Sequence, residues 1–228
     1  MTKTEYKMIE AYMQRMMRDS AHDKHHVYRV LNTALDIADH TEVNDKDVLI
    51  AACLLHDIGR DGSPAGPDGY CHAEAGGKAA FKFLLSIDWP EDKTLHVKEC
   101  IASHRYRGNA SPQSVEAKIL YDADKLDASG ALGIARTLIY EGQVTEPLYI
   151  MDTGGNIVTD GGGGGISSFF QEYNYKLKNV YTAFYTERAE EIALKRQKTA
   201  IGFYNGLYDE ITENYTEGIS KRLSLSDG

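Results

Sequence analysis

The chain has 228 residues, 42% of them hydrophobic, and a formal net charge of −9. This length and composition suffice for one sizeable core, or for a core with a modest appendage. The acidic balance, with a pI near 5.4, argues against a protein that coats nucleic acid or binds an anionic membrane. A small phosphate ligand remains compatible with it, because a metal ion and a few local cations can overcome a weak mean field.

Sorting and redox signals point to one compartment. The sequence has no stretch of about 18 apolar residues, and the polar run TKTEYKMIE near its start lacks the apolar segment of a signal peptide. We therefore expect a cytoplasmic protein with no membrane partner. Its three cysteines (Cys53, Cys71 and Cys100) have no CxxC spacing. This predicts reduced thiols and neither a disulfide framework nor a cysteine-type zinc site.

Apolar residues recur at helical spacing along most of the chain, which predicts an all-α fold. Asp45 is suited to cap the central helix, and Pro90 fits the first turn of a later one. A break is expected near Gly130 or Gly133 in the longest pattern, and the last dozen residues should fray. The predicted helices cover 1–18, 23–40, 46 to about 57, 72–85, 90–104, 114–140, 167–185 and 187–215.

A glycine-rich segment, 141–165, interrupts the helical pattern with the run TGGNIVTDGGGGG. Five consecutive glycines take a fixed conformation only at a high entropic cost, so we expect a mobile surface excursion. Two short β-like runs, at 148–151 and 157–159, leave a weak hairpin open within it.

The chain is organised around the decapeptide AACLLHDIGR at 51–60. Its first five residues would form a helix that is apolar on nearly every side, so this helix should be central and buried. His56 and Asp57 then end it, and both are costly to bury unless they are paired or bind a metal ion. Gly59 tolerates the left-handed conformation that often ends helices. A histidine stabilised by the helix dipole, with an aspartate in the next turn, explains the decapeptide equally well.

Other helical segments also carry ionisable groups on apolar faces or at helix ends. His26 lies on the second predicted helix, His104 lies near the end of the fifth, and Asp122, Asp124 and Asp127 lie within an apolar run. A lone histidine in such a place is more often a structural residue. Several of them together with carboxylates indicate a mixed nitrogen and oxygen site for a divalent ion such as Mn, Fe, Co, Ni or Zn.

Three motifs in a fixed order give a definite family resemblance. They are HDKHHVYRV at 22–30, LLHDIG at 54–59 and AKILYDADKLDASGALGIAR at 117–136. Together they resemble the HD superfamily of metal-dependent phosphohydrolases, and 169–197 is similar to a bacterial subgroup that hydrolyses nucleotides. The resemblance implies an HD-domain helical bundle forming a single domain over 1–228, with a catalytic core over about 8–140, the glycine-rich excursion over about 141–166 and C-terminal helices over about 167–215.

The resemblance implies four metal ligands, His26, His56, Asp57 and Asp124, and one divalent ion per chain (Mn, Fe, Co, Ni, Zn or Mg). Asp122 is the rival of Asp124. Residues two apart on a helix point about 200° apart, and each of the two aspartates shares its side with apolar residues. Periodicity therefore does not separate them, whereas the match of ADKL to the family's closing motif favours Asp124.

The catalytic residues that this resemblance suggests are Asp57 and Asp61. Asp61 would orient or deprotonate the attacking water. Related enzymes often have an acidic residue where this chain has Arg60, so the general base stays open.

Four further residues are candidates for substrate binding. Arg29 and Lys125 lie next to expected ligands and are candidate phosphate contacts, although a solvated or ion-paired cation explains each of them equally well. His72 and His104 are expected to line the pocket, and a second metal ion held by them is the alternative.

The expected activity is hydrolysis of a nucleotide or related small phosphoester by a metal-activated water, as a phosphatase, pyrophosphohydrolase or phosphodiesterase. The alternative is a non-catalytic, metal-containing module that senses a nucleotide. The intact ligand set favours the enzyme. The expected partner is thus a small phosphorylated substrate and not a nucleic-acid polymer, and the sequence leaves a homodimer open.

Overall fold

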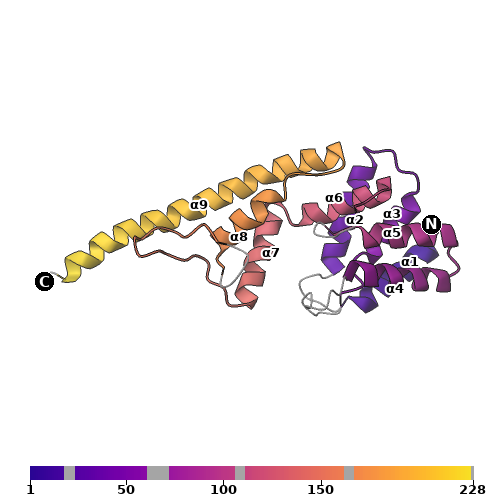
Figure 1. Cartoon of the computed structure of the whole chain (residues 1–228), viewed down its shortest axis with the longest axis horizontal. Helices are drawn as coiled ribbons and strands as arrows, with labels where there is room; N and C mark the ends of the chain where they lie inside the picture. The colour runs from indigo at the N-terminus through magenta and orange to yellow at the C-terminus, as the bar shows by residue number, and fades with distance from the viewer. Residues whose placement is uncertain (18–23, 61–71, 106–110, 162–166, 227–228) are drawn as a thin grey trace. The chain divides into compact units, whose positions relative to one another are not determined.

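The computed structural model describes residues 1–17, 24–60, 72–105, 111–161 and 167–226. Within these residues the regular elements are helices, together with one isolated β-bridge between Met151 and Ile157. This confirms the predicted all-α class. Figure 1 labels the α-helices. The elements are α1 (Lys3–Met16), α2 (Lys24–Ala38), α3 (Lys46–Leu55), α4 (His72–Ser86), α5 (Glu91–Ala102), α6 (Val115–Asp127), α7 (Gly130–Gln143), α8 (Phe169–Tyr175), the short 3-10 helix η1 (Leu177–Asn179) and α9 (Glu187–Ser226).

The chain divides into two compact units. Unit 1 comprises Met1–Asp127 and Phe184–Glu190, and unit 2 comprises Ala128–Ala183 and Glu191–Gly228. The prediction of one domain over 1–228 stays a prediction.

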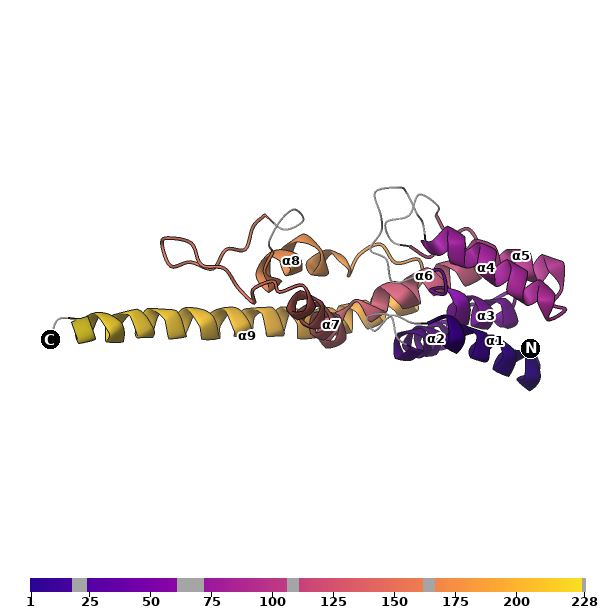
Figure 2. The ribbon, with the colours of Figure 1, turned by 90° about the horizontal axis from the view of Figure 1, so that it is seen from below.

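Unit 1 is a helical bundle built around α3. This helix contacts α1, α2, α4, α5 and α6, and Figure 2 shows it between the α4–α5 pair and the α1–α2 pair. Residues from Val48 to Leu55 other than Ile50 are all buried along it. The central, buried helix expected from the decapeptide is therefore confirmed, and burial of so many aliphatic side chains is what fixes α3 in the bundle.

The start of α3 is fixed by two carboxylates. Asp45 caps it as predicted, since its Oδ1 accepts hydrogen bonds from the backbone N–H groups of Asp47 and Val48 at 2.9 and 3.2 Å. Glu116, in the first turn of α6, accepts one from the backbone N–H of Asp45 at 2.8 Å. The start of α3 is thus tied to the start of α6, and α6 carries the acidic motif.

The long pattern over 114–140 is broken where expected. Gly130 begins α7 with a φ of +66°, a conformation that glycine adopts without strain. The C-terminus differs from the expectation, because α9 continues to Ser226 and includes a Glu217–Lys221 ion pair spaced i,i+4.

Unit 2 is held together by an aromatic cluster. Phe169 and Phe170 of α8 are fully buried, and their rings meet those of Phe203 and Tyr204 of α9 at centroid distances of 5.7 and 5.1 Å. The Met151–Ile157 bridge is a minimal form of the weak hairpin left open by the sequence. The glycines at 162–165 lie outside the described residues, so the mobile excursion stays a prediction.

None of the helices that the structure describes has the length and apolarity needed to cross a membrane.

Candidate metal centre

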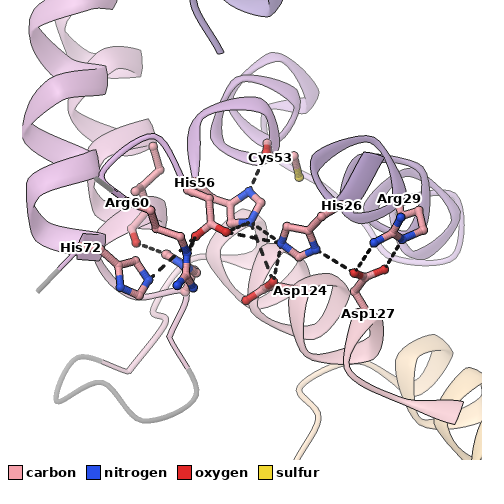
Figure 3. A network of polar contacts seen from close by, with 11 residues as sticks. His26, Arg29, Cys53, His56, Arg60, His72, Asp124 and Asp127 are labelled. Carbon is pink, nitrogen blue, oxygen red and sulfur yellow. Dashed lines mark hydrogen bonds and ion pairs between the residues drawn. The ribbon is translucent and has the colours of Figure 1, made fainter. Parts of the chain in front are cut away.

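Three helices and one turn of unit 1 bring two histidines and two aspartates together (Figure 3). His26 comes from α2, His56 ends α3, Asp57 follows it in the turn, and Asp124 comes from α6. The Nε2 atoms of His26 and His56 are 3.2 Å apart. Asp57 Oδ2 lies 3.5 and 3.6 Å from them, and Asp124 Oδ1 lies 3.3 and 3.8 Å from them. The four ligands expected from the sequence therefore lie within one small volume.

A second group shares Asp57. Its other oxygen, Oδ1, lies 3.8 Å from His72 Nε2 and 3.7 Å from His104 Nε2. Both sets, His26 with His56 and Asp57, and Asp57 with His72 and His104, have the mutual proximity of metal-binding groups. The structure thus places His72 and His104 across Asp57 from His26 and His56.

The imidazoles are held with one defined nitrogen towards the carboxylates. The outer nitrogen, Nδ1, contacts a carboxylate or a backbone carbonyl in three of them, and these groups only accept hydrogen bonds. Nδ1 is therefore the donor, which leaves Nε2 to face the aspartates. The contacts are His26 to Asp127 at 2.7 Å, His56 to the carbonyl of Cys53 at 2.8 Å and His104 to the carbonyl of Ile101 at 2.6 Å.

Two buried polar atoms fit a bound cation. Asp57 Oδ2 and His72 Nε2 are buried and have no hydrogen-bond partner among the described residues. Leaving such atoms unpaired inside a protein is costly. Carboxylate oxygens and imidazole nitrogens are also the donor set that suits divalent transition metals. The residues present therefore fit a divalent ion.

Burial and neighbouring charges shift the pKa values of the clustered groups in different directions. Burial lowers the pKa of His56 to about 4, so this imidazole is neutral at neutral pH. Burial also disfavours the charged form of His26, but hydrogen bonding to three aspartates, Asp124 first, outweighs it and holds the pKa of His26 well above its ordinary value. Burial opposes ionisation of Asp57, yet the neighbouring histidines hold its pKa well below its usual range. The cluster therefore favours ionised carboxylates and has a strong attraction for positive charge.

Asp127 is a part of the site that sequence reasoning did not assign. Its Oδ2 accepts from His26, and Arg29 donates to Oδ1 through Nε at 2.8 Å and to Oδ2 through Nη2 at 3.0 Å. The bidentate contact with Arg29 holds the Asp127 carboxylate in place, and this carboxylate in turn orients the imidazole of His26. The available signal was the helical spacing, since Asp127 lies three residues after Asp124 on the same side of α6.

Arg60 is the second residue that sequence reasoning left without a role. Its Nε donates to Asp57 Oδ1 at 2.8 Å, and its side chain is 30% exposed. The cation thus neutralises part of the Asp57 charge at the rim of the cluster. In the sequence, only the spacing of three residues between Asp57 and Arg60 indicates this contact.

Asp122 and Asp124 have separate surroundings. Asp122 is fully buried and accepts hydrogen bonds from the backbone N–H groups of Tyr185 and Thr186 and from the Thr186 hydroxyl at 2.7 Å. It therefore secures the chain just before α9. Asp124, with 27% of its side chain exposed, is the one that faces His26.

Two further site residues expected from the sequence are Lys125 and Asp61. Lys125 is 6% exposed, with Nζ at 4.7 Å from the ring centroid of Phe184 and 5.6 Å from that of Tyr121. Burial lowers its pKa. Asp61 lies outside the described residues.

Gly59 has a different role from the one its sequence position suggested. Its φ is not in the left-handed region. A Cβ at this position would instead lie 2.2 Å from the carbonyl oxygen of His72 and 2.5 Å from the backbone nitrogen of Gly76. The left-handed expectation is therefore wrong, and glycine is needed because the turn after α3 packs directly on the backbone of α4. This close approach sets His72 beside Asp57.

Comparison with protein families and known proteins agrees with this geometry. A family model described as the HD domain matches residues 24–129, the stretch that contains the expected ligands from His26 to Asp124. Residues 24–129 are therefore an HD domain. HD domains bind divalent metal ions, and the His and Asp groups described above are able to hold one.

Three relatives show how far the likeness extends. YpgQ of Bacillus subtilis is 28% identical over 207 residues, which cover 89% of this chain and 92% of YpgQ. Its crystal structure in complex with ADP matches with a TM-score of 0.69 at 23% identity, over 90% of this chain and 97% of that one, which shows the shared fold. A predicted HD superfamily hydrolase from an uncultured Thermotogales bacterium matches with a TM-score of 0.59 at 28% identity, over 91% and 92% of the two chains.

The third relative is larger than this chain. The 3′-5′ exoribonuclease YhaM of Bacillus licheniformis is 30% identical over 146 residues, which are 56% of this HD-domain chain and 45% of YhaM. The likeness therefore covers less than half of YhaM.

Proposed function

We propose that this HD-domain protein is a metal-dependent phosphohydrolase that acts on a nucleotide or a related small phosphoester. One observation carries the proposal. The buried Nε2 atoms of His26 and His56 lie 3.2 Å apart, and one oxygen each of Asp57 and Asp124 lies within 3.8 Å of both nitrogens, while both Nδ1 atoms are hydrogen-bonded elsewhere. Such a set needs a positive charge at its centre.

The proposed ligands are His26, His56, Asp57 and Asp124, holding one divalent ion per chain. A divalent ion so bound makes water acidic enough to supply hydroxide near neutral pH and offsets charge on a phosphoryl oxygen. Asp57 is shared between the two groups, so His72 and His104 would border the substrate. An ion held by Asp57, His72 and His104 is the alternative use of these two histidines.

The chain's own cations would orient the phosphate. Arg60 lies at the rim of the cluster, and its guanidinium already contacts Asp57, so it is placed to meet an incoming phosphate oxygen. Arg29 holds Asp127, so any phosphate contact by Arg29 adds to that role. Lys125 stays a candidate contact, and Asp61 stays the candidate for orienting the water.

Two relatives support a nucleotide as substrate. YpgQ was crystallised with ADP, and YhaM carries the name of an enzyme that cleaves RNA. ADP and RNA both contain the ribose-phosphate unit. A hydrolase for free nucleotides would use that unit without needing a basic surface, which fits a net charge of −9.

A substrate panel tests this proposal. Chelator-treated protein would be incubated with nucleoside mono-, di- and triphosphates, a cyclic nucleotide and a short oligoribonucleotide, each with Mn²⁺, Co²⁺, Mg²⁺ or no metal. Release of phosphate, pyrophosphate or nucleoside monophosphate is expected from at least one free nucleotide with a metal present. Metal binding without any turnover across the panel would favour the nucleotide-sensing alternative.

A further inference from the structure

A second feature of unit 1 lies between α1 and α4, along most of the length of α4. It is a surface hollow of about 560 Å³, a volume within the range of small-molecule sites. The lining residues are Tyr12, Arg15, Ala75, Lys78, Ala79, Lys82, Phe83 and Ser86. We call it the α1–α4 hollow.

The charge of this hollow is opposite to that of the protein. Arg15, Lys78 and Lys82 are exposed and line it, and none of its lining residues is acidic. Among the described residues, no ion pair is formed by any of these three cations. Lys78 and Lys82 are spaced i,i+4 on one helix, where like charges repel. A bound anion would relieve this repulsion.

The hollow also offers flat aromatic surface. The rings of Tyr12 and Phe83 are stacked at a centroid distance of 3.8 Å with 9° between their planes. The guanidinium of Arg15 lies 5.1 Å from the ring centroid of Tyr12. Because Phe83 covers one face of Tyr12 and Arg15 lies over the ring, a planar base would stack on the guanidinium of Arg15, since guanidinium planes stack on bases as aromatic side chains do.

The hollow is separate from the candidate metal centre but shares a helix with it. His72 begins α4, and Phe83 lies eleven residues further along. At about 1.5 Å per residue this separates them by roughly 16 Å along the helix axis. Ala75, at the near edge of the hollow, is only three residues from His72, whereas Lys82 and Phe83 lie near the other end of α4.

We propose that the α1–α4 hollow is a second binding site, which takes a nucleoside diphosphate or triphosphate. Lys78 and Lys82 hold the phosphates, and the guanidinium of Arg15, supported by the Tyr12–Phe83 stack, holds the base. The proposal does not rest on hydrolysis at the metal centre, since the hollow contains no metal ligand and its binding needs no metal.

The test measures binding to chelator-treated full-length protein, with ADP and inorganic pyrophosphate as probes in a calorimetric titration. The variant Lys78→Gln/Lys82→Gln should weaken binding of both probes about tenfold or more, because it removes two charge-assisted contacts. Tyr12→Leu should weaken ADP and leave pyrophosphate within about twofold, because only ADP carries a base. The matched control is Lys3→Gln/Lys7→Gln, which removes two exposed charges from α1 outside the hollow and should change neither affinity.

Three results would overturn the proposal. One is ADP binding that is unchanged in the Lys78→Gln/Lys82→Gln variant, and another is equal weakening in the Lys3→Gln/Lys7→Gln control. The third is an oligoribonucleotide of six residues that binds more than about tenfold tighter than ADP, since that would make the hollow part of a polynucleotide track. Turnover with added metal is scored separately, so failure of the hollow and failure of the hydrolase proposal give different results.

Discussion

Asp127 accepts a hydrogen bond from Nδ1 of His26 at 2.7 Å and holds Arg29 with the same carboxylate. This pairing fixes the ring of His26 so that Nε2 points to Asp57 and Asp124. A carboxylate behind a ligating histidine orients the ring and raises its basicity. The candidate centre thus depends on a residue that need not touch the ion.

We predict that Asp127→Asn lowers affinity for the divalent ion about 10- to 100-fold, because the amide is a weaker acceptor for His26 and loses the charge that pairs with Arg29. Titration of chelator-treated protein with Co²⁺, followed by its visible absorption, measures this. Asp36→Asn is the matched control. Asp36, on α2, likewise pairs with an arginine, Arg188, yet it belongs to neither metal-binding group. Equal loss in the two variants would contradict a specific role for Asp127.

Asp124→Asn and Asp122→Asn should affect different properties. Asp124→Asn should remove most of the metal affinity while leaving the unfolding midpoint nearly unchanged. Asp122→Asn should retain the metal but lower the free energy of unfolding by about 1–3 kcal/mol, since it disrupts the buried hydrogen bonds to Tyr185 and Thr186. Metal titration and urea denaturation of both variants measure the two effects. A larger loss of metal affinity in Asp122→Asn would reverse the assignment.

Gly59→Ala should destabilise unit 1 by about 1–3 kcal/mol or more, because the new Cβ would overlap backbone atoms of His72 and Gly76 that cannot move aside alone. Thermal unfolding followed by circular dichroism measures this. Gly206→Ala serves as control, since a Cβ there meets nothing within 4 Å and alanine favours the helix. A Gly59→Ala variant as stable as the wild type would mean that the close contact with α4 is not required.

Glu141 makes the stability of unit 2 depend on pH. Its carboxylate is buried without a hydrogen-bond partner among the described residues, and burial, with Glu146 and Glu172 nearby, raises its pKa from 4.5 to about 7. Between these values the folded chain keeps a proton that the unfolded chain has lost, so stability falls as pH rises through this range. Glu141→Gln should therefore raise the free energy of unfolding by on the order of 1 kcal/mol at pH 8 and leave it unchanged at pH 4. Urea unfolding at the two pH values checks this, and an equal gain at both would contradict it.

The sequence predicted the helices well because their order follows from apolar spacing and local caps. Asp45 illustrates this, since it bonds within its own first turn. The break at Gly130 was equally local. Both depend on residues a few positions apart, which is the range over which periodicity and capping act.

The choice between Asp122 and Asp124 could not be made from periodicity. Both lie in an apolar run, and the partners that separate them come from Tyr185, Thr186 and His26, each more than 60 positions away in the sequence. The left-handed conformation assigned to Gly59 failed for a similar reason. Its need for glycine comes from the backbone of α4 and not from its own turn. Contacts between helices therefore decided what local patterns left open.

The central claim is that the His26, His56, Asp57 and Asp124 cluster holds the ion used for hydrolysis, and metal stoichiometry with turnover in Asp57→Ala tests it most directly. Wild-type protein should bind one divalent ion per chain and release phosphate or pyrophosphate from a nucleotide. Asp57→Ala should bind none and release none while its circular dichroism keeps the helical signal. An Asp57→Ala variant with wild-type metal content and wild-type rate would contradict the account.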